Sequence, residues 1–177
     1  MTVANAVRSP AARAPAPRGR RVTSVLDDAA LVHLVGYAAS RAALELRKVF
    51  ALHMEPFDLT VPQFSILMLV ASNGDVNQKQ LGLALDISPP NMAVTLDRMA
   101  ERGWIERVRS TRDRRAQHIH LTKAGQALAK RVRKISATME EPALAVLSRA
   151  ERALLIELLR KLAFSAQREP SHSVNRP

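Results

Sequence analysis

The side chains best suited to chemistry in this sequence are arginines gathered in one short segment. Seven arginines but only three acidic residues lie between Arg98 and Arg115. A guanidinium group donates several hydrogen bonds in a fixed fork and pairs well with phosphate. The segment therefore predicts contact with a polyanion such as nucleic acid, the alternative being a solvated hairpin tip that aids solubility.

Composition narrows the class of protein. The 177 residues include 27 Lys and Arg against 16 Asp and Glu, a formal net charge of +11, and 47% are hydrophobic. This predicts one domain with tails and a polyanionic partner, either nucleic acid or an anionic membrane surface. The chain has no cysteine, which excludes disulfides and thiolate metal sites and fits a reducing, cytoplasmic setting.

Other site chemistry has little support. No glycine spacing suits a phosphate cradle and no nucleophile or paired carboxylate stands out, so we expect no enzyme activity and no cofactor. His118 and His120 share one face of an expected strand, but without cysteine or a nearby acid we expect them on the surface and predict no metal site. The longest nearly uncharged apolar stretch, residues 29–40, is too short to span a bilayer.

The two ends of the chain differ from its middle. Residues 1–23 contain five arginines and no acid in an Ala- and Pro-rich background, which predicts a disordered basic arm. It is read as a solvated tail, with a transit-peptide-like segment or a membrane-binding arm as alternatives. Residues 166–177 are expected to form a flexible tail.

The first predicted helix is long. Ser24 and Asp27 form a capping box, so a helix is expected over residues 24–55, ended by Pro56. Two apolar stripes on this helix require two partners. Their members are Leu31, Leu34, Val35 and Ala38, and Val32, Gly36, Ala39 and Ala43.

Two shorter helices follow. Thr60 with Gln63 predicts the start of the first, and Asn73-Gly74 predicts its left-handed end. Asn77 with Gln80 predicts the start of the second. Its expected buried residues are Leu81, Ala84 and Leu85.

Ser88 at the N-cap and Pro89 at the first helical position predict the start of the next helix. Met92, Leu96 and Met99 at helical spacing predict its buried stripe, and Gly103 its end. Two short helices joined by a tight turn predict a helix-turn-helix, whose second helix enters the major groove of DNA. The residues off the buried stripe are Asn91, Val94, Thr95 and Arg98.

Two short strands are expected after Gly103, in "WIERVR" and "AQHIHL", joined by the polar turn "STRDRR". The predicted fold is therefore mainly α, a winged helix-turn-helix with a two-stranded β-wing. Arginines at the wing tip suit the narrow minor groove of DNA. We expect Arg115 to be oriented by Asp97 or Asp113.

The C-terminal third predicts self-association. Leu128, Val132, Ile135 and Met139 form a heptad-like stripe on a helix that starts after Thr122. Ser148 and Glu151 cap a last helix whose leucines exceed what a small winged helix could cover. These leucines are Leu155, Leu158, Leu159 and Leu162.

Three runs together resemble one known family: "LTVPQFSIL", "LDISPPNMAVTLDRMAERGWIERVRSTRDRRAQHIHLTKAG" and "LSRAERALLIELLRKL". From about Ser24 to Phe164 the chain resembles the MarR family of bacterial transcription regulators. The resemblance implies a homodimer with interlocking N- and C-terminal helices (24–55 and 123–165) around a winged helix-turn-helix (60–122). It also implies a nucleoid-associated repressor of a pseudo-palindromic operator, released by a phenol or aromatic carboxylate.

The expected DNA contacts come from the recognition helix and the wing. They are Ser88, Pro90, Asn91, Val94, Thr95, Arg98, Arg112, Arg114 and Arg115. Two residues depart from the family pattern. Val94 stands where an arginine is frequent, and Trp104 stands where leucine is usual and is interpreted as a larger core residue rather than a stacking partner for a ligand.

A ligand is expected at the junction between the long first helix and the segment "HMEPFDLTVPQF", where it could alter the spacing of the recognition helices. Cations and hydroxyls beside an apolar lining suit a planar aromatic acid. The residues concerned are His33, Tyr37, Ser40, Arg41, His53, Phe57, Phe64 and Met68. The alternative for each is ordinary packing or exposure.

Two other functions remain open. A ligand-independent architectural DNA-binding protein would bind with an affinity that depends on salt but hardly on sequence. A membrane-surface or scaffold protein would bind lipid through its basic arm.

Overall fold

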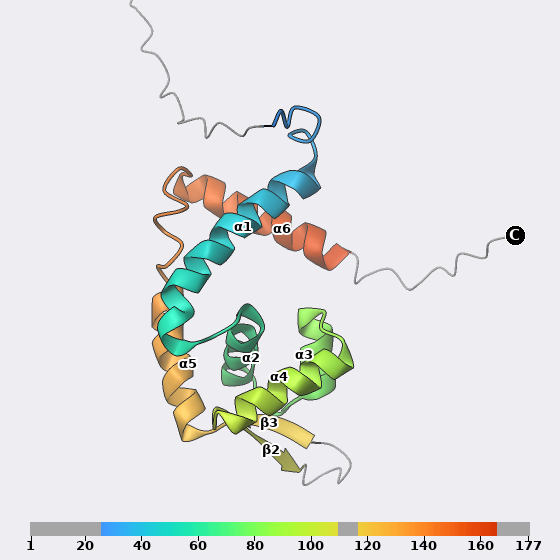
Figure 1. The fold of residues 1–177 in the computed structure, drawn as a ribbon, viewed down its shortest axis with the longest axis vertical. Helices are drawn as coiled ribbons and strands as arrows, with labels where there is room; N and C mark the ends of the chain where they lie inside the picture. Colours follow the sequence, from blue (N-terminus) through green and yellow to red (C-terminus); the bar gives the residue numbers. More distant parts are fainter. Residues whose placement is uncertain (1–25, 110–116, 166–177) are drawn as a thin grey trace, which may run out of the picture. The chain divides into compact units, whose positions relative to one another are not determined.

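The computed structural model describes residues 26–109 and 117–165 (Figure 1). They fall into two compact units, Met1–Ala38 and Ala39–Pro177. The basic arm predicted over residues 1–23 and the tail predicted over residues 166–177 lie outside the described residues. No helix in the described ranges is both long enough and apolar enough to cross a membrane.

In the first unit the predicted helix start is wrong. The long helix α1 spans Val35–Met54, and residues 26–34 form turns and bends before it. The Asp27 carboxylate accepts a hydrogen bond from the backbone N–H of Ala29 at 3.0 Å, and the Asp28 carbonyl accepts from Leu31 at 2.8 Å. Short aspartate side chains that bond nearby backbone favour turns over helix, which explains the later start.

The second unit holds the rest of α1 and all the other elements. A short 3-10 helix, η1 (Glu55–Phe57), follows α1 at Pro56. The remaining elements are α2 (Val61–Ser72), β1 (Val76–Asn77), α3 (Gln78–Leu85), α4 (Pro89–Glu101), β2 (Ile105–Arg109), β3 (Gln117–Leu121), α5 (Lys123–Ser136) and α6 (Arg149–Ser165).

Two capping boxes set the starts of α2 and α3 as predicted. Thr60 and Gln63 bond each other's backbone N–H, and so do Asn77 and Gln80. The predicted left-handed end of α2 is wrong, because Asn73 is extended with φ −127° and its side chain donates to the Leu69 carbonyl at 2.7 Å. That side-chain bond satisfies a free carbonyl of the last turn, which a left-handed residue would otherwise satisfy.

The wing belongs to a three-stranded antiparallel sheet in the order β1-β3-β2. Ile105 of β2 lies opposite Leu121 of β3, as expected for a hairpin. The two-residue strand β1 was not predicted, and its Val76 lies opposite Ile119 on the other edge of β3. The wing is therefore joined at its base to the segment that leads into α3.

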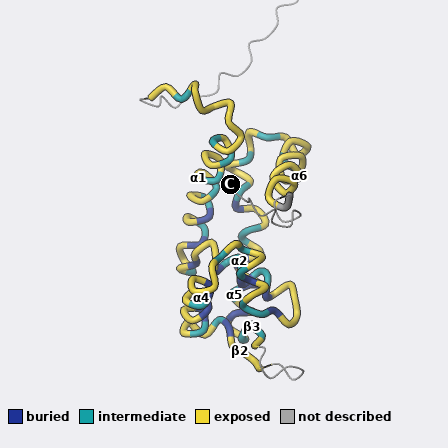
Figure 2. Tube along the Cα trace, turned by 90° about the vertical axis from the view of Figure 1, so that its right-hand side faces the viewer, coloured by how far each residue is buried: buried dark blue, intermediate teal, exposed yellow. Residues whose placement is uncertain are grey.

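The core lies where α2, α4, α5 and the sheet meet, and Figure 2 shows the buried residues concentrated there. Leu81 is buried as predicted, but Ala84 is exposed and Leu85 only half-buried. The face of α3 that packs inward is therefore narrower than predicted, with Leu81 as its buried residue. The fully buried side chains are Met54, Ile66, Leu67, Leu81, Met92, Leu96, Met99, Ile119 and Val132.

The heptad-like stripe on α5 is used differently from the prediction. Val132 of α5 and Met139 in the turn after it are buried in the chain's own core, and Leu128 and Ile135 pack against that core beside α2. The stripe therefore needs no partner chain. A 3.5-residue spacing reports an apolar face but does not say which element covers it.

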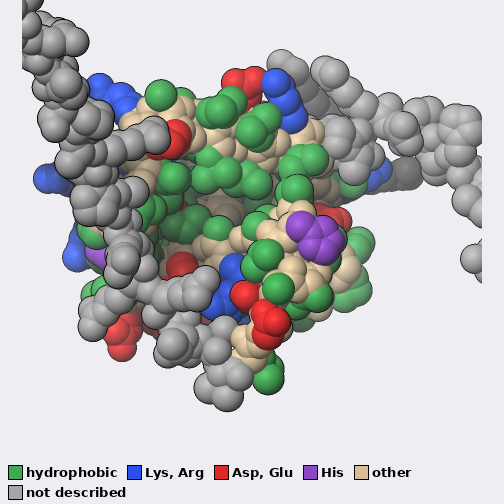
Figure 3. Space-filling model, turned by 90° about the horizontal axis from the view of Figure 1, so that it is seen from above, with side chains coloured by type: hydrophobic (Ala, Val, Ile, Leu, Met, Phe, Trp, Pro, Cys, Tyr) green, Lys and Arg blue, Asp and Glu red, His purple; other side chains and the backbone are tan. Residues whose placement is uncertain are grey.

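Unlike the stripe on α5, the apolar side chains of helix α6 are exposed. Ser148 and Glu151 cap it as predicted, with the Ser148 N–H donating to the Glu151 carboxylate at 2.7 Å. Of its side chains from Arg149 to Ala163, all but Arg152 are exposed. Figure 2 shows the helix as exposed, and Figure 3 shows hydrophobic side chains gathered on the end of the molecule where it lies. Its exposed apolar residues are Leu154, Leu155, Ile156, Leu158, Leu159 and Leu162.

Candidate nucleic-acid interface

Helices α3 and α4 pack together across a tight turn, as a helix-turn-helix requires (Figure 1). Asp86 ends α3 in the left-handed conformation (φ 51°), which aspartate tolerates better than most side chains. The N–H groups of Asp86 and Ile87 both donate to the Gly82 carbonyl. A methyl group on Gly82 would lie 3.1 Å from the Ile87 carbonyl oxygen, so the turn is closely packed.

Buried methionine and leucine fix the orientation of α4. Met92, Leu96 and Met99 have no exposed surface. The opposite side presents Asn91, Val94 and Arg98 to solvent, with Val94 49% exposed. Thr95 is half-buried and its hydroxyl donates to the Asn91 carbonyl at 2.8 Å. The face predicted to read DNA is therefore available, although the threonine hydroxyl already has an acceptor.

The start of α4 matches the prediction only in position. Pro89 and Pro90 occupy the first helical positions, but the Ser88 side chain makes no capping hydrogen bond. The proline at the first position has no N–H to satisfy, which reduces the need for a cap. Ser88 and Pro90 are exposed, and the Gln78 amide reaches the Pro89 carbonyl at 3.4 Å.

The wing tip, with Arg112, Arg114, Arg115 and Asp113, lies outside the described residues. Asp97, one of the two carboxylates expected to orient Arg115, is engaged by Arg107 of β2 at 2.7 Å. This pair links the exposed flank of α4 to the wing strand. The expected pairing of Arg115 lies outside the described residues, and the Arg107–Asp97 pair was not predicted.

Arg102 is a residue that the sequence argument missed. It follows α4 as its C-cap, and its guanidinium group donates to the Asp58 carbonyl at 2.7 Å and the Phe57 carbonyl at 3.3 Å. It also pairs with the Asp58 carboxylate at 3.0 Å and stacks on the ring of Trp104 at 3.9 Å. Trp104 is partly buried and packs against the core, as predicted.

The two histidines of β3 are less exposed than predicted. His120 Nε2 lies 3.4 Å from the carboxylate of Asp75, an acid that the sequence argument did not expect nearby. His118 is half-buried, and its Nδ1 is buried without a hydrogen-bond partner. Among the described residues no group of three or more His, Cys, Asp or Glu could hold a metal ion.

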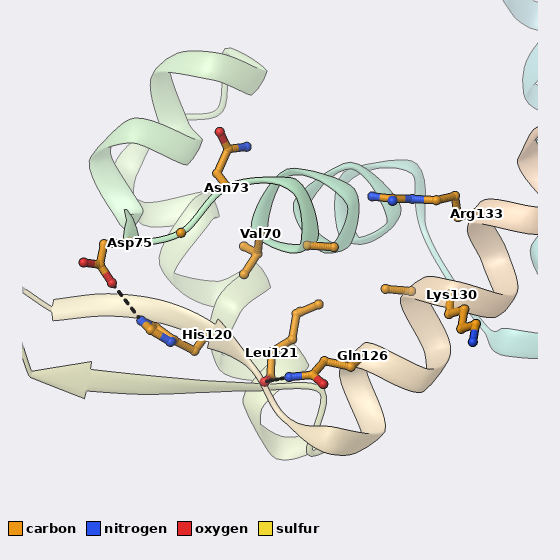
Figure 4. Close-up of a pocket in the computed structure, with 11 residues that line it drawn as sticks. Val70, Asn73, Asp75, His120, Leu121, Gln126, Lys130 and Arg133 are labelled. Carbon is orange, nitrogen blue, oxygen red and sulfur yellow. Dashed lines mark hydrogen bonds and ion pairs between the residues drawn. The ribbon is translucent and has the colours of Figure 1, made fainter.

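Of the two histidines, His120 borders a surface cavity of about 460 Å³ between α2, β3 and α5 (Figure 4). Figure 4 shows His120 turned toward Asp75, and the Gln126 amide donates to the Leu121 carbonyl at 3.3 Å. Arg133 donates to Ser72 at 2.8 Å, and Asn73 to Leu69. The polar side chains of the rim are thus largely engaged with the protein itself.

The expected ligand-binding residues are divided between the two units. His33 and Tyr37 belong to the first, where the Tyr37 hydroxyl donates to the Asp28 carboxylate at 3.3 Å. In the second unit Ser40 and Arg41 are exposed, and His53 Nδ1 lies 2.9 Å from the Val49 carbonyl oxygen.

The three apolar members of that set, all in the second unit, pack against the core. Phe64 meets Phe50 edge-to-face with ring centres 5.5 Å apart. Phe57 lies under the guanidinium group of Arg131 at 5.0 Å, and Met68 is partly buried. Their positions match the packing alternative for each residue.

Comparison with known proteins identifies the family. The MarR family model matches residues 59–116, which include the helix-turn-helix and β2, the first strand of the wing. A protein of Thauera aromatica named as a transcriptional regulator of the hcr operon is 31% identical over 152 residues, covering 82% of this chain and 90% of its own length. The chain belongs to the MarR family. Regulator HosA of Escherichia coli O157:H7 is 28% identical over 128 residues, 70% of this chain and 95% of HosA.

Solved structures agree with this placement in the MarR family. The transcriptional repressor CouR bound to a 23-mer DNA duplex superposes with a TM-score of 0.73 and 35% identity, covering 79% of this chain and 99% of CouR. CouR bound to p-coumaroyl-CoA gives a TM-score of 0.70 and 32% identity, covering 78% of this chain and 97% of CouR. The predicted mainly helical winged fold is confirmed, and the chain is a MarR-family transcriptional regulator.

Proposed function

We propose that this protein is a homodimeric repressor that binds a pseudo-palindromic DNA operator and is released by a small aromatic ligand. The observation that carries the proposal is the geometry of α4. Three fully buried side chains hold this helix, and its opposite face presents Asn91, Val94 and Arg98 to solvent. Short polar groups on such a helix suit base edges, and Val94 suits a thymine methyl group.

The dimer is supported by α6. A helix that exposes six large apolar side chains would cost free energy in water if nothing covered it. A second copy of the same face, related by twofold symmetry, would bury these side chains on both chains at once. Two recognition helices could then meet successive major grooves, roughly 34 Å apart.

A small ligand is supported by the likeness to CouR, whose structures include complexes with DNA and with p-coumaroyl-CoA. Arg41 is an exposed cation on α1, suited to a carboxylate or a phosphate. Ligand binding that favours one arrangement of α1 would change DNA affinity by the difference in ligand affinity between the two arrangements.

Selection from a pool of random DNA duplexes tests the proposal. We expect a consensus with inverted half-sites, and affinity that exceeds that for random DNA by at least about a thousandfold. Asn91→Ala should relax base preference at one position of each half-site, at a cost on the order of 1–3 kcal/mol. Enrichment without a consensus, with equal losses on all sequences, would instead favour an architectural DNA-binding protein.

The ligand arm of the experiment uses p-coumarate and p-coumaroyl-CoA as probes against the selected operator. Either probe should lower operator affinity, and Arg41→Ala should weaken that response while leaving ligand-free DNA binding unchanged. A wild-type protein that keeps its operator at saturating concentrations of both probes would remove aromatic ligands of this type from the proposal.

A further inference from the structure

The linker between α1 and α2, residues 55–60, is held by Arg102 at the C-terminal end of α4, the proposed recognition helix. Both carbonyls at Phe57 and Asp58 accept hydrogen bonds from Arg102, which also pairs with the Asp58 carboxylate. A single guanidinium group thus fixes two successive peptide units and a side chain. No other contact in the described residues ties the C-terminal end of α4 to this linker through hydrogen bonds.

The linker contains one residue with a left-handed backbone conformation. Asp58 is left-handed, with φ 48° and ψ 48°, and its N–H donates to the Glu55 carbonyl. A non-glycine residue in this region carries some strain, so neighbouring contacts must hold it there. Met54 just before the linker and Leu59 within it are buried, at 0% and 7% exposed. The linker therefore cannot shift without disturbing the core or the Arg102 contacts.

A second arginine holds the other side of the same linker. The guanidinium group of Arg131, on α5, lies over the Phe57 ring at 5.0 Å, while the Phe57 carbonyl faces Arg102. The attraction between a guanidinium group and the face of an aromatic ring favours this arrangement. Phe57 is thus held from α5 through its ring and from α4 through its backbone.

Arg102 itself is backed by a fixed surface. Its guanidinium group stacks on Trp104 at 3.9 Å. The Trp104 carbonyl accepts from the Thr122 N–H at 3.1 Å, and a methyl group on Gly125 would lie only 1.9 Å from the same oxygen. The first turn of α5 therefore presses directly on the backbone of Trp104, leaving it no room to move toward the helix.

We infer that Arg102 is a positioning residue for DNA recognition, through which the α1–α2 linker sets the position of α4. The inference rests on the proposed function, which it extends by naming the contact that connects the helices outside the winged domain to the recognition helix. A shift of α1 or α5 moves Phe57 and Asp58, and the rigid fork of Arg102 carries that shift to the C-terminal end of α4. The reading face with Asn91 and Arg98 then tilts with it.

Two substitutions of Arg102 separate positioning from charge. Arg102→Ala removes every contact, whereas Arg102→Lys keeps the charge but cannot bond both carbonyls and stack on Trp104. Lys48→Ala is the matched control, because it also removes one positive charge from an exposed ion pair, with Glu45 at 2.8 Å. Each full-length protein is titrated with the selected operator and with a random duplex of the same length, over a range of salt.

We expect both Arg102 variants to lose about tenfold in operator affinity, as is typical of coupled sites, while keeping wild-type affinity for random DNA. The salt slope should stay unchanged, since a lost phosphate contact would lower it by about one. The emission of Trp104, the sole tryptophan of the sequence, should shift in both variants and not in the Lys48 control.

Three results would overturn the inference. They are wild-type operator affinity in Arg102→Ala, full recovery in Arg102→Lys, and a salt slope reduced by one in Arg102→Ala. If the wild-type protein selects an operator and any of these results is found, the coupling through Arg102 is refuted while the proposed function stands. A wild-type protein that prefers no duplex refutes the proposed function and the coupling together.

Discussion

Replacing Gly125 by alanine tests how tightly the wing is joined to α5. Gly125 is the third residue of α5, and in an open helix the change to alanine would stabilise by roughly 0.5–1 kcal/mol. Here the added Cβ would lie 1.9 Å from the Trp104 carbonyl oxygen and 2.8 Å from its carbon. Both are backbone atoms, so rotation of a side chain cannot relieve the overlap.

The size of the destabilisation follows from how far α5 must move away from Trp104. The Cβ falls about 1.5 Å short of an ordinary contact distance, so the first turn of α5 must move away from Trp104. That movement strains two hydrogen bonds of Thr122, to the Trp104 carbonyl at 3.1 Å and to the Gly103 carbonyl at 2.6 Å. Each strained hydrogen bond costs about 1 kcal/mol. Adding the lost packing and subtracting the gain in helix stability, we expect Gly125→Ala to lower the free energy of unfolding by about 2–3 kcal/mol.

Chemical denaturation at one fixed protein concentration measures this change, with circular dichroism and Trp104 fluorescence as probes. Gly36→Ala on α1 is the matched control, because a Cβ there would meet nothing within 4 Å. We expect that control to be stabilised by a few tenths of a kcal/mol. If Gly125→Ala were as stable as Gly36→Ala, the close approach of α5 to Trp104 would be wrong.

Two further predictions concern ion pairs and acid. The charged groups of Asp97 and Arg107 lie 2.7 Å apart, with 53% and 33% of their side chains exposed. Because solvent screens this pair, a double-mutant cycle should give a coupling energy of only about 0.5 kcal/mol. A value above about 2 kcal/mol would contradict the assignment to a solvent-screened pair. Hydrogen bonds from the Ser148 side chain and backbone hold the pKa of Glu151 below its ordinary value of 4.5. The capped start of α6 is therefore favoured above that pH and lost as pH falls through the lowered pKa, so helicity by circular dichroism should fall in acid, less so in Glu151→Gln.

Local signals in the sequence predicted much of the fold. The boxes at Thr60, Asn77 and Ser148 each begin a helix in the structure, because both partners of a capping box lie within four residues. Ser24 lies outside the described residues, but the helix expected to start there is absent from residues 26–34, where Asp27 bonds the nearby Ala29 N–H and the chain turns instead. Strand β1 escaped prediction because two residues show no alternation.

In the candidate site too, local patterns were predictable and contacts between distant residues were not. Periodicity alone identified the buried stripe of α4, and with it the exposed residues opposite. It could not identify Arg102, since the carbonyl that Arg102 bonds at Asp58 is 44 residues away in the chain. Nor could it tell that Val132 packs inside its own chain, because an apolar stripe looks the same whichever surface covers it.

The short strand β1 has a consequence for the DNA itself. Asn77 is both the partner of His118 in the sheet and the N-cap of α3, so one residue joins the root of the wing to the helix-turn-helix. A helix in the major groove and a wing beside it would then meet the duplex as one rigid body. A duplex whose groove geometry does not match must bend or twist to satisfy both contacts, and the cost depends on the stiffness of the base-pair steps between them. Base pairs that no side chain touches would thereby contribute to the choice of operator.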